Sequence, residues 1–165
     1  VYLIFEQEAP FDPWHTGKLS SSSANKWVDF QLFGSTADCL TTLKNDGYTL
    51  LATALTEESE DLFTAEFNEQ HFALLLGNEN RGLSETALAM ADRTLKIPMR
   101  GMVQSFNLSV TAGICLFEIT RQRLLRGMDA YQLPEETQAE LFDNFLQRRY
   151  PPPQDPADLL APPES

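Results

Sequence analysis

Residues 97–118 read IPMRGMVQSFNLSVTAGICLFE and decide the fold of this chain. An apolar strand end, Leu95–Pro98, runs into a short loop with one glycine, and Ser105 and Asn107 follow as a Ser-x-Asn triplet. A long helical pattern begins immediately afterwards. Open α/β folds build their ligand sites from polar groups at the points where strands end and helices begin. The stretch therefore predicts a ligand site at a strand-to-helix connection.

A second connection of this kind, which we call a switch because a strand pattern changes to a loop and then to a helix, lies about twenty residues earlier. There residues 72–84 read FALLLGNENRGLS. The apolar run Phe72–Leu76 predicts a central buried strand. Gly77 and Gly82 flank the polar trio at residues 78–80, and glycine permits tight turns and close approach of the backbone to a ligand. Two such switches close together in the chain predict one shared site.

The remaining pattern alternates strands with helices, which predicts an α/β fold with a mostly parallel sheet flanked by helices. Further strands are expected over residues 1–5, 27–33 and 48–55. Helices are expected over residues 35–47, 84–91, 107–126 and 135–149, with Ser35, Ser84 and Asn107 as possible caps and Pro134 in the first turn of the last helix. One domain over residues 1–150 is expected. Six prolines among residues 151–165 predict an extended or disordered tail.

Composition excludes several classes of protein. No apolar run approaches 18 residues, and no signal-peptide pattern opens the chain, so we expect no membrane partner. Cys39 and Cys115 stand 76 positions apart in apolar helical contexts, which predicts buried free thiols and a reducing cytoplasm. His15 and His71 lack a second ligand at zinc spacing, so no metal is expected. The glycines fit neither a dinucleotide-binding motif nor a P-loop.

The charge is unevenly distributed. A formal net charge of −12 is unlike that of a generic nucleic-acid binder. Residues 81–126, however, hold seven Lys and Arg against three Asp and Glu, a local balance of +4. This local excess is compatible with RNA as a partner. The alternative is that these arginines only solvate helix surfaces.

The two switch regions carry a resemblance to a known family. LLLGNENRGLS resembles the second motif, and IPMRGMVQSFNLSVTAGICLFE the third, of the SpoU (TrmH-like) RNA 2′-O-ribose methyltransferases, which have the SPOUT fold. The likeness spans residues 1–126, and the Gly-Met-Val-Gln-Ser-x-Asn motif is most similar to that of the tRNA (guanosine-2′-O) branch. The resemblance implies a carboxyl-terminal trefoil knot, S-adenosyl-L-methionine as cofactor, RNA (tRNA or rRNA) as substrate, and a homodimer. Helix 107–126, apolar over more than one face, independently favours a homodimer.

The resemblance also implies roles for individual residues. It makes Thr53, Gly77, Ile97 and Phe106 the candidates for cofactor binding. Its catalytic candidates are Glu79, Ser105 and Asn107, and its candidates for RNA contact are Arg81 and Arg100. Six of them have a simpler alternative: Ile97 and Phe106 could be core residues, Asn107 a helix cap, Glu79 a turn former, and the two arginines solvated side chains.

One departure from the family separates two functional hypotheses. Family members begin with an Asn-rich motif carrying an Arg implicated in catalysis, just before a strand like Val1–Ile4, and this sequence does not contain it. The first hypothesis is an S-adenosylmethionine-dependent RNA 2′-O-ribose methyltransferase that acts on tRNA guanosine, with this chain a fragment of it. The second is a catalytically weak module that binds RNA or the cofactor. On either hypothesis we expect this chain alone to transfer methyl groups poorly.

Overall fold

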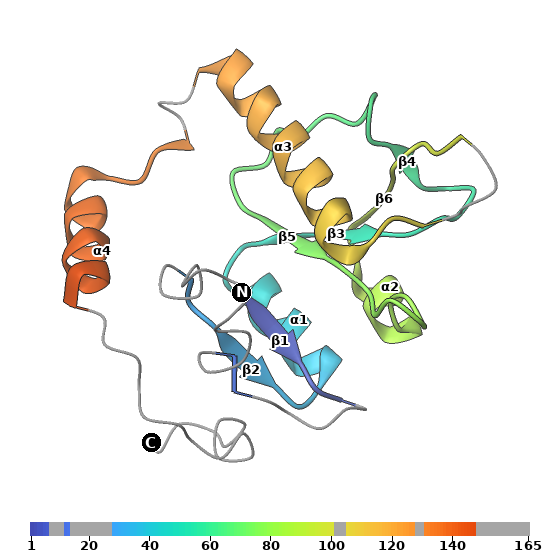
Figure 1. Ribbon diagram of the computed structural model, residues 1–165, viewed down its shortest axis with the longest axis horizontal. Coiled ribbons are helices and arrows are strands. Elements are labelled where there is room, and N and C mark those ends of the chain that lie inside the picture. The colour runs from blue at the N-terminus through green and yellow to red at the C-terminus, as the bar shows by residue number, and fades with distance from the viewer. Residues whose placement is uncertain (7–11, 14–27, 101–104, 128–130, 148–165) are drawn as a thin grey trace. The chain divides into compact units, whose positions relative to one another are not determined.

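The computed structural model describes residues 1–6, 12–13, 28–100, 105–127 and 131–147. The predicted tail at 151–165 lies outside the described residues. The chain divides into two compact units, Val1–Cys39 with Leu133–Ser165, and Leu40–Gln132. The boundary falls inside helix α1 (Thr36–Asn45). Figure 1 shows the elements of both units.

The first unit holds a two-stranded parallel sheet. Strand β1 (Tyr2–Ile4) pairs with β2 (Gln31–Phe33), and the rings of Tyr2 and Phe33 stack with centroids 6.0 Å apart. Both predicted strands are confirmed in shortened form. An apolar run such as residues 1–5 predicts a buried strand, but β1 is not buried, because Tyr2 and Ile4 are each 37% exposed. A sheet of only two strands buries little of the side-chain surface on either of its faces.

Two helices belong wholly or partly to this unit. The hydroxyl of Ser35 accepts a hydrogen bond from the backbone N–H of Asp38 at 3.3 Å, as expected for the start of α1. Gly47, with φ +81°, follows the end of that helix and confirms the predicted stop. Helix α4 (Glu135–Gln147) begins directly after Pro134 and has no buried residue.

The second unit is built on a four-stranded, fully parallel sheet with the strand order β4-β6-β3-β5. The strands are β3 (Thr49–Thr53), β4 (Glu60–Asp61), β5 (Phe72–Leu75) and β6 (Arg93–Lys96). The prediction of a central buried strand at 72–76 is wrong. β5 forms one edge of this sheet, and each of its residues is half-buried. The central strands are β3 and β6.

The whole of strand β4 and the start of strand β6 were not predicted, because both contain charged residues. β4 consists of two acidic residues, which no apolar pattern reveals, and it forms because Glu60 pairs with Leu95 and Asp61 with Lys96. β6 begins at Arg93, two residues before the predicted Leu95. Charged residues can occupy these strands because the carboxylate of Glu60 accepts two hydrogen bonds from the Arg93 guanidinium, at 2.8 and 2.6 Å.

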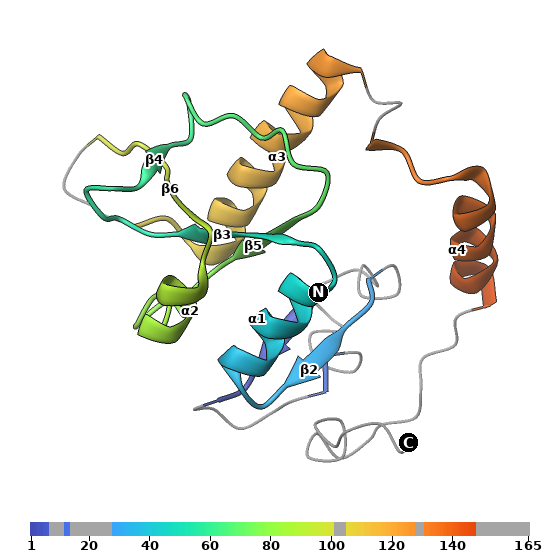
Figure 2. The same ribbon diagram turned by 180° about the vertical axis from the view of Figure 1, so that it is seen from behind.

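The sheet is covered by helices, as Figures 1 and 2 show from opposite sides. Helix α3 (Leu108–Arg126) crosses one face and inserts Cys115 and Ile119 into a core with Leu51 and Leu95. The segment after β4 adds its buried apolar residues to this core, namely Leu62, Ala65 and Phe67. The short helix α2 (Glu85–Met90) lies against β3. Its predicted cap is confirmed, since the Ser84 hydroxyl accepts from the Ala87 N–H at 3.2 Å.

The carboxyl-terminal half of α3 is fastened to the segment between β4 and β5. The side-chain amide of Gln122 accepts from the Phe67 N–H at 3.1 Å and donates to the Ala65 carbonyl at 2.8 Å. Arg126 donates to the Phe67 carbonyl, and Arg123 to that of Gln70. These bonds anchor that end of the helix. No helix among the described residues has the length and apolar character to span a bilayer.

Candidate functional site

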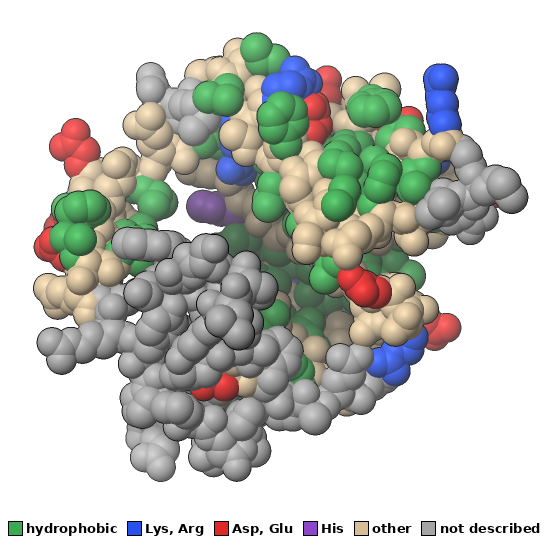
Figure 3. Space-filling model, in the orientation of Figure 1, with side chains coloured by type: hydrophobic (Ala, Val, Ile, Leu, Met, Phe, Trp, Pro, Cys, Tyr) green, Lys and Arg blue, Asp and Glu red, His purple; other side chains and the backbone are tan. Residues whose placement is uncertain are grey.

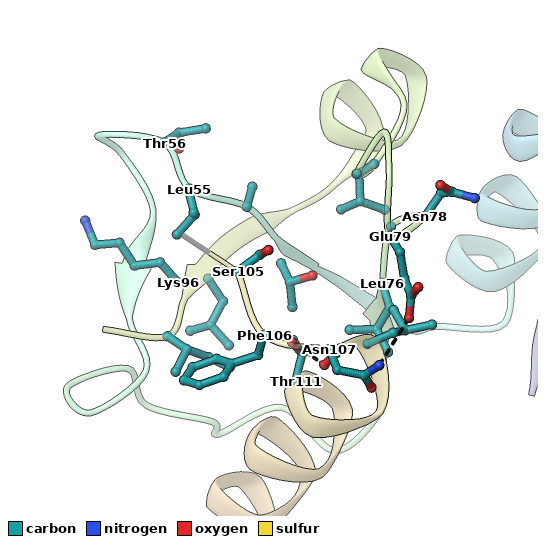
Figure 4. Close-up of a pocket in the computed structure, with 18 of the residues that line it drawn as sticks. Leu55, Thr56, Leu76, Asn78, Glu79, Lys96, Ser105, Phe106, Asn107 and Thr111 are labelled. Carbon is teal, nitrogen blue, oxygen red and sulfur yellow. Dashed lines mark hydrogen bonds between the residues drawn. The ribbon is translucent and has the colours of Figure 1, made fainter. Parts of the chain in front are cut away.

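A cavity of about 640 Å³ opens at the carboxyl ends of three strands of the second unit. Thr53 ends β3, Leu76 follows β5, and Lys96 ends β6, and all three line the cavity together with the start of α3. Because the strands are parallel, their carboxyl ends meet at the same edge of the sheet. The volume lies in the range of small-molecule sites in proteins. Figure 4 shows this cavity.

The structure brings together all the residues predicted for cofactor binding and catalysis. The residues concerned are Thr53, Gly77, Glu79, Ile97, Ser105, Phe106 and Asn107, and each lines the cavity. The two residues predicted for RNA contact lie elsewhere. Arg81 and Arg100 are exposed and are not among the described lining residues. They do lie next in sequence to lining residues, Gly82 and Met99.

The loop after β5 is closed on itself. The backbones of Asn78 and Gly82 exchange two hydrogen bonds, at 3.0 and 2.7 Å. The side-chain Oδ1 of Asn78 accepts a hydrogen bond from the Asn80 N–H at 2.9 Å. Gly82 has φ +69°, which a side chain would disfavour. A Cβ on Gly77 would lie 2.2 Å from the carbonyl carbon of Gly82. The loop itself therefore requires glycine at position 77.

Glu79 and Asn107 connect the two loops that carry the sequence motifs. Asn107 Nδ2 donates a hydrogen bond to Glu79 Oε1 at 3.2 Å, which the dashed line in Figure 4 marks. The other atom of the same amide, Oδ1, accepts from the Ser109 N–H at 2.9 Å and caps α3. The helix-cap alternative for Asn107 is therefore confirmed. The same side chain also fixes the carboxylate at the cavity wall.

One wall of the cavity is apolar. Ile97 packs against the buried core, so the core alternative holds for part of its surface. Phe106 is 41% exposed and Leu55 62%, and both line the cavity, so the core alternative does not describe Phe106. Figure 4 shows Leu55, Lys96 and Phe106 on one side, with Asn78 and Glu79 on the other. An apolar wall beside loop backbones suits a flat heteroaromatic ring.

The turn that follows β3 was missed by the sequence analysis. The buried hydroxyl of Ser59 donates to the Ala54 carbonyl at 2.8 Å and accepts from the Thr56 N–H at 3.2 Å. These bonds hold Ala54, Leu55 and Thr56 in the cavity wall. At the end of β3, the Thr53 hydroxyl donates to the Leu75 carbonyl at 3.0 Å, so it joins β3 to β5. The signal available in the sequence was the Thr-x-x-Ser spacing, which is typical of a side-chain-bonded turn.

The ionisable residues of the cavity carry opposite charges. Among the described residues that line it, Glu79 and Lys96 are the only ionisable ones. Lys96 was not predicted, because a lysine at the end of a strand gives no distinctive pattern. No group of three or more His, Cys, Asp or Glu side chains in the described part of the chain could hold a metal ion.

The arginines of residues 81–126 do not form one unpaired basic patch. Arg93 bonds to Glu60 at 2.6 Å and Glu69 at 3.1 Å, both outside that segment, and Arg121 bonds to Glu118 at 2.7 Å. The hydrogen bond from Arg93, with its charge, lowers the pKa of the Glu60 carboxyl although partial burial opposes this. Arg93, on strand β6, and Arg121, on helix α3, are therefore engaged in ion pairs within the chain.

Comparison with known proteins agrees with this geometry. Residues 1–117 match the model of the SpoU rRNA Methylase family. A tRNA (guanosine(18)-2′-O)-methyltransferase of Thermus thermophilus is 39% identical over 130 residues, which are 78% of this chain and 66% of that protein. The chain thus spans just under two thirds of that relative's length.

Solved structures give the same result. The A. aeolicus TrmH/SpoU tRNA modifying enzyme superposes with a TM-score of 0.69 at 30% identity, covering 89% of this chain and 75% of that one. The SpoU methyltransferase AviRb from Streptomyces viridochromogenes, in complex with AdoMet, superposes with a TM-score of 0.62 at 25% identity over 74% of this chain and 49% of that one. From its motifs, its sheet and these matches, the chain belongs to the SpoU rRNA Methylase family.

Proposed function

We propose that this chain is part of an S-adenosylmethionine-dependent RNA 2′-O-ribose methyltransferase that acts on guanosine in tRNA. One observation carries the proposal: seven residues from three separate sequence regions line a single cavity at the carboxyl edge of a parallel sheet. The guanosine and tRNA parts rest on the name of the Thermus relative. The cofactor part rests on the AdoMet-bound relative, AviRb, and on the chemistry of the cavity.

The residues present fit the cofactor. Ile97 and Phe106 offer an apolar wall for an adenine ring, and the loops at Gly77 and Ser105 bring backbone polar groups to the same cavity. When bound, the cofactor supplies a methyl group on a sulfonium sulfur for in-line transfer. The carboxylate of Glu79 is the negative group of the cavity and attracts a cationic ligand centre.

The chain's own polar side chains would order the reacting groups. In this proposal Asn107 holds the start of α3 and the Glu79 carboxylate in one arrangement. The Ser105 hydroxyl, which lines the cavity, contacts the substrate ribose. The bound cofactor would supply the methyl group and the sulfur leaving group, while Ser105 and Asn107 would hold the ribose 2′-hydroxyl and the first turn of α3 in place for the transfer. Positioning of this kind accounts for large parts of enzymatic rate enhancement.

Binding and transfer are tested separately. Calorimetry with S-adenosylhomocysteine measures binding, and labelled S-adenosylmethionine with bulk tRNA measures transfer. Phe106→Ala is expected to weaken binding about tenfold, since it removes much of the apolar wall. Phe63→Ala, at a residue that is 75% exposed and does not line the cavity, is the matched control. A folded chain that gives no heat with millimolar ligand would contradict the proposal.

A second candidate function has its own supporting observation. No arginine is among the described residues that line the cavity, whereas the family resemblance implies a catalytic arginine. A module that binds cofactor or RNA with little turnover fits this composition. If the chain binds S-adenosylhomocysteine and labels no RNA, while an amino-terminally extended version does label it, the first function holds for the longer protein. If neither labels RNA, the binding module is the better description.

Arg81 and Arg100 are the proposed RNA contacts. Both are exposed, and both flank loops that reach the cavity, where phosphates of a bound RNA would pass. Replacing Arg100 by Gln is expected to weaken tRNA binding and to lower its salt dependence by about one unit of slope. Unchanged salt dependence would remove Arg100 from the interface.

A homodimer is also proposed. Val110, Phe117 and Leu124 recur at seven-residue spacing along α3 and are 47%, 70% and 59% exposed. Figure 3 shows hydrophobic side chains gathered on the face of the second unit that carries α3. Such an apolar stripe on a helix is typical of an interface. Light scattering should report a dimer at tens of micromolar, and Phe117→Glu should shift it towards monomer.

The knot, the single domain and the cellular location complete the proposal. A trefoil knot is implied by the family resemblance of the two motifs, and stretching the chain between its ends should leave a contour shorter than that of an unknotted chain. A domain over residues 1–150 predicts one cooperative unfolding transition. The two free, buried cysteines are compatible with a cytoplasmic location.

A further inference from the structure

Thr111 brings a hydroxyl group from helix α3 to the wall of the cavity. It lies in the first turn of the helix, four residues after the cap Asn107. Its side chain is half-buried, and its hydroxyl donates a hydrogen bond to the Asn107 carbonyl at 3.2 Å. A polar group that a ligand cavity leaves accessible can bind a polar group of the ligand.

The hydrogen bond inside α3 fixes which role is left for this hydroxyl. A hydroxyl has one proton and two acceptor lone pairs. The Thr111 proton is directed to the Asn107 carbonyl, which also accepts the Thr111 N–H at 2.9 Å. The Thr111 oxygen therefore keeps its lone pairs for another donor. Side chains of a helix tilt towards its amino-terminal end, so this oxygen lies at the end of α3 that lines the cavity.

The position of Thr111 relates it to two parts of the proposed ligand. Figure 4 shows Thr111 between the ring of Phe106 and the side-chain amide of Asn107. Phe106 belongs to the apolar wall proposed for the adenine ring, and Asn107 holds the Glu79 carboxylate proposed to attract a cationic centre. In S-adenosylmethionine the ribose joins the adenine to the cationic sulfur. A ligand seated in this order brings its ribose hydroxyls to Thr111.

We propose that Thr111 Oγ1 accepts a hydrogen bond from a ribose hydroxyl of S-adenosylmethionine, and that this contact makes the cavity prefer a ribose to a deoxyribose. This inference rests on the proposed function. The adenine amino group and the methionine ammonium are the other donors of this ligand, and they lie at its two ends. Thr111 lies between the walls proposed for those ends, so a donor from the middle of the ligand is favoured. A site that hydrogen-bonds a ligand hydroxyl rejects the analogue that lacks it.

The ribose of the target nucleotide presents the same kind of hydroxyl. The cofactor ribose is favoured because Thr111 is half-buried, whereas Ser105, which also lines the cavity, is exposed. The less exposed hydroxyl suits the ligand that fills the cavity, and the exposed one suits a nucleotide that approaches from solvent. Binding measured without RNA distinguishes the two sources.

The experiment is a double-mutant cycle between Thr111 and the ligand, measured by calorimetry without RNA. The ligands are S-adenosylhomocysteine and its 2′-deoxy and 3′-deoxy forms, each of which lacks one ribose hydroxyl. Thr111→Val keeps a similar shape and helix propensity but removes the acceptor, so it should weaken binding of S-adenosylhomocysteine about fivefold. The deoxy form that lacks the bound hydroxyl should change by less than about twofold, because it has no such hydrogen bond to lose. Thr111→Ser should keep most of the affinity. Thr120→Val, the same substitution at an exposed residue of α3 that does not line the cavity, should change no affinity.

The ratio of two affinities on one variant guards against misfolding, since partial unfolding lowers both affinities equally. Equal weakening of all three ligands by Thr111→Val, or no weakening, overturns the inference. So does a variant that loses tRNA affinity alone, which assigns Thr111 to the target nucleotide. If the unaltered chain binds S-adenosylhomocysteine and the variant binds it equally well, only this inference fails. If the unaltered chain binds none of the three ligands, the proposed function fails as well.

Discussion

Asn107 Nδ2 lies 3.2 Å from Glu79 Oε1, and this hydrogen bond joins two loops that are 28 residues apart in the sequence. The same amide caps α3 through its other atom. One side chain therefore sets both the start of a helix and the position of a carboxylate at the cavity wall. The two roles can be separated by substitution, because only the second needs the amide nitrogen.

Asn107→Ala should lower the free energy of unfolding by about 1 kcal/mol, the usual cost of losing a helix cap. Asn107→Ser keeps a capping oxygen but cannot donate across to Glu79 as the longer amide does. It should retain most of the stability and still weaken binding of S-adenosylhomocysteine. Urea denaturation and calorimetry on both variants give the comparison. Equal ligand affinity in the Ser variant and the unaltered chain would show that the link to Glu79 has no part in binding.

Gly77→Ala should destabilise the chain by about 2 kcal/mol or more, because the added Cβ would meet the backbone of Gly82 and Leu83 at 2.2–2.3 Å. Gly113, inside α3, has no atom within 4 Å of an added Cβ. Gly113→Ala should therefore stabilise by about 0.5–1 kcal/mol through helix propensity. Thermal melts of the two variants test the contrast. Similar melting temperatures would mean that the Gly77 loop opens easily.

The Glu60–Arg93 pair predicts a dependence of stability on pH. The pKa of Glu60 in the folded chain lies below its ordinary value of 4.5, chiefly because of the hydrogen bond from Arg93. The unfolded chain therefore binds this proton first as pH falls. The stabilisation is complete above about pH 4.5 and is lost as pH falls through the folded pKa. Glu60 is part-exposed, so we expect roughly 0.5–1 kcal/mol.

Glu60→Gln tests that expectation, because it removes the titrating group and leaves a polar side chain. Its unfolding free energy should fall less steeply between pH 5 and pH 3 than that of the unaltered chain. Glu57→Gln, at an exposed glutamate for which the structure shows no ion pair with a described residue, is the control. A Glu60 variant with an unchanged acid slope would place the acid sensitivity elsewhere.

Both cysteines should resist thiol reagents while the chain is folded. Burial raises the pKa of the Cys39 and Cys115 thiols to about 11, so at pH 8 only about one thiol in a thousand is ionised, three pH units below the pKa. The thiolate is the reactive form, and the thiols are also sterically covered. Ellman's reagent should label neither at pH 8 until denaturant is added. Rapid labelling of one thiol without denaturant would reveal local opening around it.

Much of the site could be predicted from sequence because it lies at strand ends with distinctive residues. Ser84 and Asn107 cap their helices as their residue types favour. Gly77, Phe106 and the intervening motif residues reach one cavity because parallel strands end at one edge. Residue type and spacing within a short stretch of sequence are enough to predict these caps and strand-end residues, and contacts with distant parts of the chain do not change them.

The parts that could not be predicted depend on partners distant in sequence. Glu60 is in a strand because of pairing with Leu95 and because Arg93 neutralises it, and neither is visible in a local window. The apolar run at 72–76 looks central although β5 is an edge, since hydrophobicity does not encode strand order. Lys96 enters the cavity through the register of β6 against its neighbours.

The anchoring of α3 has a mechanical consequence. One end of this helix lines the cavity, and the other is bonded through Gln122 to Ala65 and Phe67. A helix of 19 residues is about 28 Å long and resists axial compression. Any shift of its first turn when a ligand enters must therefore rotate the helix or strain the Gln122 bonds. A fluorescent group attached near Ala65 would then change its signal when a ligand binds at the opposite end of α3.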